Sequence, residues 1–208
     1  MRLEETPQSA EVERIYIATR TPLEVRSRFG APRNRPMTYS RIDVGVPTSH
    51  SPGNIELRNW RNPPERFTVW DYGRFAGASS FRRSLQAEAA WSDDVTLVFV
   101  HGYKTGTMEA VLRFAQINTD FRQNARSVLF SWPSANDPRA YLYDRDSALF
   151  ARDDLVDLID TVTTDNTREV AIIAHSMGAF LAMEMLRQIA LSGQDELASR
   201  ITWVALVS

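Results

Sequence analysis

A serine with a small residue two positions before it and another two positions after it is the most chemically informative feature of this 208-residue sequence. It lies in the segment Ala174-His175-Ser176-Met177-Gly178, after a run of apolar residues and before a segment with helical spacing of apolar residues. A serine on a sharp turn from a buried strand into a helix is typical of a nucleophile elbow, and small flanking residues allow that turn. We therefore interpret Ser176 as a nucleophile, with Ala174, His175 and Gly178 supporting the turn.

A second motif, His101-Gly102-Tyr103, directly follows the apolar run 95–100 (VTLVFV). Parallel strands end at the same edge of a sheet, so this loop can direct the backbone N–H of Tyr103 to the point that the N–H of Met177 faces. Two such donors stabilise the negative oxygen that develops during acyl transfer. The two motifs together predict an oxyanion hole made by Tyr103 and Met177, with His101 and Gly102 supporting the loop.

The elements that position these motifs follow from hydrophobic periodicity. Apolar runs alternate with segments of helical spacing after residue 93, which predicts an α/β fold with a mostly parallel sheet and helices on both faces. We expect strands at 95–100, 127–130, 169–174 and 201–207, and helices at about 108–124, in a long stretch ending near 162, and at 178–191.

The first part of the chain has a different texture. Residues 1–92 are rich in Pro, Gly, Arg and Ser, with four prolines in the segment 47–64. We interpret 1–92 as an N-terminal extension with short strands and a Pro-rich loop, and 93–208 as the core domain. Within the extension, we expect strands at 14–19, 39–46 and 66–70 and a helix at 75–90.

The chain resembles the α/β-hydrolase superfamily, and more narrowly a poorly characterised bacterial group of esterase- or lipase-like hydrolases. The resemblance implies a three-layer α/β-hydrolase-like fold and ester hydrolysis through an acyl-enzyme on Ser176, with no metal and no cofactor. The matching segments are VFVHGY at 98–103, EAVLRFAQI at 109–117, VLFSWPS at 128–134, YDRDSALFARDDL at 143–155, AHSMGAFL at 174–181, IYIATR at 15–20, YSRIDVGVP at 39–47 and SPGNIEL at 51–57.

A serine hydrolase also needs a histidine base and an acid that orients it, and in this fold both follow the serine in the chain. No histidine follows Ser176. His101 and His175 belong to the two motifs, and His50 lies in the Pro-rich segment. We therefore expect the chain to be truncated at its C-terminal end, with a sheet incomplete at that edge and the triad acid and histidine beyond Ser208.

Composition excludes several other classes. The absence of cysteine excludes a thiol nucleophile and a Cys-ligated metal site, and 24 basic against 26 acidic residues give no electrostatic footprint for nucleic acid. The mixed-sign stretch 144–154 (DRDSALFARDD) is typical of a salt-bridged helix surface, so we expect no metal site there.

Three functional hypotheses remain. The first is a carboxylesterase or lipase-like serine hydrolase whose partner is a small acyl ester. The second is a non-catalytic binding or interaction protein on the same scaffold, lacking the triad histidine and acid. The third, an acyltransferase, shares the elbow. The sequence contains no signal peptide and no apolar run long enough to span a membrane. We expect a cytoplasmic protein, or a secreted or envelope protein if the start is misplaced, and the sequence leaves its oligomeric state open.

Overall fold

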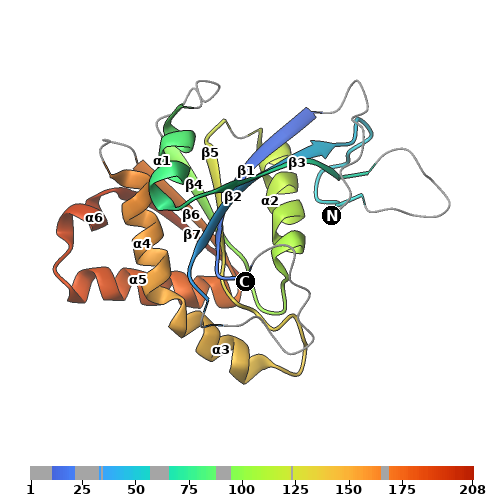
Figure 1. Cartoon of the computed structure of the whole chain (residues 1–208). Helices are drawn as coiled ribbons and strands as arrows, with labels where there is room; N and C mark the ends of the chain where they lie inside the picture. The colour runs from blue at the N-terminus through green and yellow to red at the C-terminus, as the bar shows by residue number, and fades with distance from the viewer. Residues whose placement is uncertain are drawn as a thin grey trace.

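The computed structural model describes residues 11–21, 33, 35–56, 66–87, 95–122, 124–164 and 169–208. These residues form a seven-stranded sheet with the order β3-β2-β1-β5-β4-β6-β7 (Figure 1). Strands β1, β5, β4, β6 and β7 run parallel, whereas β2 and β3 join β1 in antiparallel orientation. The strands are β1 (Glu11–Thr19), β2 (Thr38–Val46), β3 (Thr68–Phe75), β4 (Val95–Val100), β5 (Arg126–Ser131), β6 (Glu169–His175) and β7 (Ile201–Val207).

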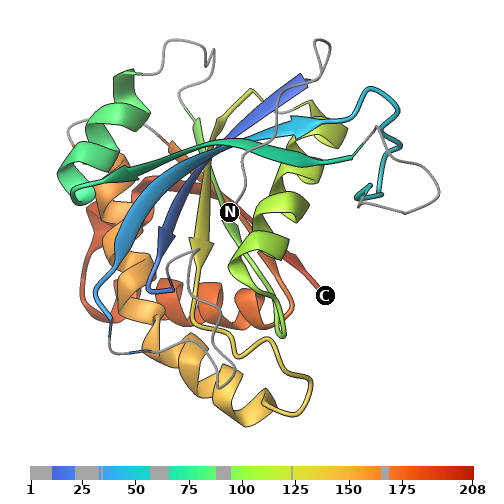
Figure 2. The ribbon, with the colours of Figure 1, turned by 45° about the vertical axis from the view of Figure 1, so that its right-hand side comes forward.

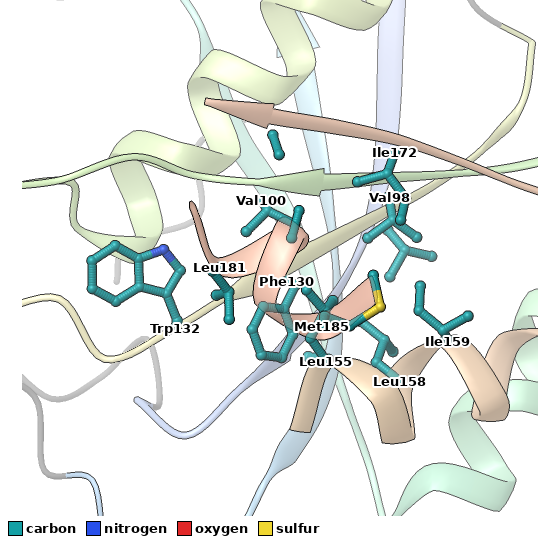
Figure 3. Close-up of a cluster of buried hydrophobic side chains, with 14 of the residues drawn as sticks. Val98, Val100, Phe130, Trp132, Leu155, Leu158, Ile159, Ile172, Leu181 and Met185 are labelled. Atoms are coloured by element: carbon teal, nitrogen blue, oxygen red, sulfur yellow. The ribbon is translucent and has the colours of Figure 1, made fainter. Parts of the chain in front are cut away.

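Helices cover both faces of the sheet (Figure 2). Of the helices in the described ranges, α2 is the one that packs on one face, through Ala110, Val111 and Phe114. Helices α1, α4 and α5 pack on the other face, where Phe130 of β5 meets Leu158 and Met185 (Figure 3). The helices are α1 (Ala78–Ala87), α2 (Thr107–Phe121), α3 (Tyr141–Phe150), α4 (Arg152–Thr163), α5 (Met177–Leu191) and α6 (Asp195–Ser199).

The central strands explain the apolar runs of the sequence. All six residues of β5 are buried, and five of the six residues of β4 are buried. A strand with helices on both faces has no solvent-facing side, so its sequence does not alternate. The expected α/β class, with a mostly parallel sheet between helical layers, is confirmed.

The long helical stretch before residue 163 is two helices rather than one. Ala151 has φ −83° and ψ 0°, and α3 ends there while α4 begins. The break changes the direction of the chain, so α4 follows the sheet while α3 lies below its edge (Figure 1). The expected helix at 75–90 is α1, but it begins at Ala78 rather than at Phe75, which is the last residue of β3. It ends at Ala87, and residues 88–90 lie outside the described part of the chain.

The N-terminal strands belong to the same sheet as the rest of the molecule. Strand β1 pairs with β5 in parallel register, from Ile15 beside Ser127 to Thr19 beside Ser131. The boundary that we expect between residues 92 and 93 lies outside the described residues, so the division into extension and core stays a prediction.

Strand β7 lies at one edge of the sheet, paired with β6 alone. Its side chains are half-exposed, and Trp203 keeps 53% of its surface accessible. Among the helices that the structure describes, none combines the length and apolar character of a membrane span.

Candidate active site

Ser176 lies between the end of β6 and the start of α5, with φ 52° and ψ −119°. This backbone conformation is the one that glycine usually occupies in a type II′ turn, and it is costly for a residue with a side chain. The Ser176 N–H donates to the carbonyl of Val207 at 2.7 Å, and its carbonyl accepts from the N–H of Ala179 at 2.9 Å. The neighbouring strand and the helix therefore fix the turn, and the serine itself is exposed.

Gly178 lets α5 begin directly against the end of β4. A Cβ atom at this position would lie 2.5 Å from the carbonyl oxygens of both Val100 and His101. Both atoms belong to the backbone of a central strand and its loop, so they have little freedom to move. The small residue two positions after Ser176 is therefore required by the contact between the two motifs.

Gly102 makes the reciprocal contact from the other motif. A Cβ atom there would lie 2.5 Å from Nδ1 of His175 and 3.1 Å from the His175 carbonyl oxygen. The structure thus brings the His-Gly loop and the serine turn together, as the strand order implies. Ala174, two positions before Ser176, is fully buried.

The His101 side chain packs under the loop 101–103 and is held by hydrogen bonds and a stacking contact. Its ring is buried and stacks on Trp132 with centroids 5.0 Å apart, and the Trp132 indole N–H donates to the His101 carbonyl at 2.8 Å. The His101 ring contacts the Gly102 carbonyl through Nδ1 and the Ser131 hydroxyl through Nε2. Burial lowers the pKa of His101 to about 4, so the ring is neutral at pH 7. Both ring nitrogens already have hydrogen-bond partners.

One backbone N–H donor in each motif remains available. Met177 is the first residue of α5, where an N–H has no acceptor within the helix. Among the described residues, none accepts a hydrogen bond from the N–H of Met177 or of Tyr103. The Tyr103 hydroxyl donates to the Pro138 carbonyl at 2.6 Å, and its ring packs against Tyr141. The geometry leaves two unpaired donors at the junction of the motifs.

A pocket of about 420 Å³ opens beside the turn, on the side of the sheet that carries α2. Gly102 and His175 line it from the two motifs, while Glu109 and Arg113 line it from α2. Its volume falls within the range of small-molecule sites in proteins. The serine turn is therefore adjacent to space that a small ligand can occupy.

No described side chain forms a hydrogen bond with the Ser176 hydroxyl. Glu184 on α5 pairs with Arg187 at 2.8 Å, and Glu196 on α6 pairs with Arg200 at 3.6 Å. His175 is exposed, and its ring forms no hydrogen bond or ion pair with an acid among the described residues. The expectation that the triad histidine and acid lie beyond Ser208 stays a prediction.

His50 lies at the opposite edge of the sheet from Ser176. It follows β2, whose last residue, Val46, pairs with Glu11 at the start of β1. Its Nδ1 lies 2.8 Å from Glu56 and its Nε2 lies 2.8 Å from Asp120. Burial disfavours the charged ring, but these two carboxylates outweigh burial and raise the pKa of His50.

Asp144 is a polar residue whose place the sequence did not predict. It begins the mixed-sign stretch that we expected to form a surface, yet it is fully buried. Asp154 is buried as well and pairs with Arg20 at 2.5 Å, whereas Asp146 and Asp153 form the expected exposed pairs. The expectation was wrong for Asp144 and Asp154, because helical spacing places them on the covered sides of α3 and α4.

A signal for this burial exists in the sequence. Asp144 shares one face of α3 with Ser147 and Ala148, which are also buried. Small residues at positions three and four after a polar residue indicate a helix face that packs closely. Within the described ranges, no cluster of three or more His, Asp or Glu side chains is arranged to bind a metal ion.

Comparison with known protein families gives one match. Residues 76–208 match the model of a family described as alpha/beta hydrolase of unknown function (DUF900). No curated protein and no solved structure matches the chain significantly. The matched region includes both motifs and every strand from β4 onward, and the resemblance to the α/β-hydrolase superfamily is confirmed. The chain belongs to this family of alpha/beta hydrolases of unknown function.

Proposed function

We propose that the protein is a serine hydrolase of the carboxylesterase or lipase-like kind, with Ser176 as its nucleophile. The Ser176 hydroxyl oxygen attacks the ester carbonyl carbon, and the oxygen that becomes negative accepts hydrogen bonds from Tyr103 N–H and Met177 N–H. The alcohol leaves with a proton, and water then hydrolyses the acyl-enzyme. The observation that carries the proposal is the strained turn that presents Ser176 beside two unpaired backbone donors.

The attack needs a base to accept the hydroxyl proton. The rings of His101 and His50 are held by other partners, and His50 lies at the far edge of the sheet. His175 has no acid beside it among the described residues. The described contacts place none of these three histidines in a triad with Ser176, so the proposal assigns the nucleophile and the oxyanion donors and leaves the base unassigned.

The second candidate is a binding protein built on the same scaffold. The specific observation in its favour is that no described side chain contacts the Ser176 hydroxyl. In that case the pocket beside Gly102 and His175 would hold a ligand without turning it over. The same free N–H groups would then bind an anionic group of the ligand.

Labelling with a fluorophosphonate probe separates the two candidates. The probe phosphonylates activated serines, and added imidazole can act as an external base for the 208-residue chain. We expect an adduct on Ser176, found by peptide mass spectrometry, in the native protein and in Ser192→Ala, and none in Ser176→Ala. Ser192 is the matched control because it lies at the other end of α5. Absence of a Ser176 adduct with and without imidazole would overturn the hydrolase proposal and favour the binding protein.

A further inference from the structure

We propose that Asp144 is a positioning residue for the oxyanion hole and that it acts through the backbone N–H of Lys104. The inference rests on the proposed role of the Tyr103 N–H and names the group that fixes its direction. Asp144 lies on α3, far in sequence from the loop that it contacts, and its side chain does not touch the position of a substrate.

The carboxylate of Asp144 joins three segments of the chain. One oxygen accepts from the Ser134 hydroxyl at 2.7 Å and from the Lys104 N–H at 3.2 Å. The other oxygen accepts from the Ala135 N–H at 2.6 Å. The loop after β4, the loop after β5 and helix α3 therefore share one acceptor.

The position of Asp144 is a costly place for a carboxylate. The residue is fully buried, and among the described residues its partners are backbone N–H groups and a hydroxyl rather than a cation. Burying a charged group is unfavourable unless donors surround it, and an apolar residue would fill the space at lower cost. Both backbone donors belong to loops at the carboxyl edge of the sheet, so the carboxylate fixes these loops rather than the core.

The hydrogen bond from the Lys104 N–H to Asp144 holds the backbone of Lys104, which directly follows Tyr103. Lys104 has φ 55°, a left-handed conformation that is unfavourable for a residue with a side chain. This conformation reverses the chain directly after Tyr103, and the Tyr103 hydroxyl anchors the same turn to Pro138. The Lys104 N–H belongs to the peptide that follows Tyr103, so its bond to Asp144 holds Tyr103 on the C-terminal side, while the close contact of Gly102 with His175 holds it on the other side. Held on both sides, the Tyr103 N–H keeps one direction. Without the Asp144 bond, the chain can relax to a common conformation and turn that N–H away.

The substitution Asp144→Asn removes one backbone bond and little else. An amide has one acceptor oxygen, so it cannot accept from both the Ala135 N–H and the Lys104 N–H on opposite sides. The Ala135 bond is shorter, so we expect the amide oxygen to remain there and the Lys104 N–H to lose its acceptor. The Ser134 hydroxyl can reverse and accept from the amide. Asp146→Asn is the matched control, because Asp146 lies on the same helix in an exposed pair with Arg145.

The rate of Ser176 phosphonylation tests the inference, measured over a range of probe concentrations. Misplacing a group in an active site by about 1 Å costs up to ~10²-fold in rate. We expect the maximal labelling rate of Asp144→Asn to fall about 10- to 100-fold, with the half-saturating probe concentration nearly unchanged. Asp146→Asn and Ser134→Ala, which keep both backbone bonds, should label at the rate of the native protein.

Hydrogen exchange gives a second readout, which can already be measured on the native protein. The Lys104 amide should be protected in the native protein although the residue itself is exposed, and Asp144→Asn should abolish this protection. A native Lys104 amide that exchanges as fast as a free peptide would overturn the inference, and so would equal labelling rates in Asp144→Asn and the native protein. In both of these cases the Ser176 adduct still forms, so the proposed function stands. No Ser176 adduct in the native protein would instead overturn the proposed function, and this inference with it.

Discussion

Ser176 follows the carboxyl end of the parallel strand β6, whereas His50 follows the antiparallel strand β2 and lies beside the amino end of β1. At the carboxyl edge, Ser176 has two unpaired backbone donors beside it, but no histidine paired with an acid among the described residues. At the amino edge, His50 has two carboxylates at 2.8 Å, but no described serine hydroxyl bonded to its ring. Residue types that together would make a triad are thus separated by the length of the sheet. The chemistry open to each residue therefore depends on whether it lies at the carboxyl or the amino ends of the parallel strands.

The pKa values of His101 and His50, which lie at opposite ends of the strands, are shifted in opposite directions. Burial lowers the pKa of His101 to about 4, since its partners are a carbonyl, a hydroxyl and an indole ring. At the other edge, burial of His50 is outweighed by Glu56 and Asp120, which raise its pKa. His101 is therefore a neutral support for a loop, whereas His50 joins a loop to α2 through two carboxylates that favour its charged form.

The largest effect that we predict is at the carboxyl edge, where Gly178→Ala would force a Cβ atom to within 2.5 Å of two backbone oxygens. We expect a loss of about 3 kcal/mol or more in the free energy of unfolding, and loss of Ser176 labelling, because the turn can no longer close. Urea unfolding and fluorophosphonate labelling measure the two effects. Gly77→Ala is the control, since a Cβ there meets nothing within 4 Å and we expect a change below about 1 kcal/mol. Similar losses in both variants would show that the contact with β4 does not decide the turn.

The next effect is at the amino edge, where His50→Ala removes the positive partner of two carboxylates. We expect a loss of about 2 kcal/mol in the free energy of unfolding, with unchanged labelling of Ser176. The raised pKa of His50 gives stability that is complete below its ordinary value of 6.5 and is lost as pH rises through the folded value. The lowered pKa values of Glu56 and Asp120 give stability that is complete above about 4.5 and is lost at lower pH.

The difference between native protein and His50→Ala should therefore be greatest between about pH 4.5 and 6.5 and smaller at pH 8.5. Urea unfolding at pH 5.5 and pH 8.5 measures it. A difference that grows with pH would contradict a charged His50. A fall in Ser176 labelling would show that the two edges are coupled rather than separate.

The smallest effect compares one unusual backbone conformation at each edge. Ser176 has φ 52° and ψ −119°, whereas Arg122, at the end of α2, has φ 48° and ψ 45°. The second is the ordinary left-handed end of a helix, and the first is much rarer for a residue with a side chain. We expect Ser176→Gly to stabilise the fold by about 1 kcal/mol and Arg122→Gly to change it little. Equal shifts in urea midpoint would mean that Ser176 stores no extra strain.

Much of the fold was predictable because the strands that carry the site, β4 and β6, have unbroken apolar runs in their sequences. The run VTLVFV and the segment that ends at Ala174 have no alternation, and each is followed by a short loop and a helical pattern. Those features depend on local sequence alone. The junction of Gly102 with His175, and of Gly178 with Val100, then followed from the parallel order of the strands.

The remainder depends on contacts between distant segments. The partners of His50 include Asp120, which is 70 residues away, and the donors to Asp144 come from two other loops. A buried carboxylate that binds backbone N–H groups has no composition signal, because any residue type supplies an N–H. The break at Ala151 was missed for a related reason: apolar spacing continues across it, and the adjacent helices differ only in direction.

The hydrogen bond from the Ser176 N–H to the Val207 carbonyl links the reactive turn to the strand with one free edge. Edge strands open more easily than central strands, because fewer hydrogen bonds must break at once. Each time the end of β7 separates from β6, one of the bonds that hold Ser176 in its strained conformation is lost. The conformation of Ser176 therefore depends on the pairing of β7 with β6 as well as on the start of α5.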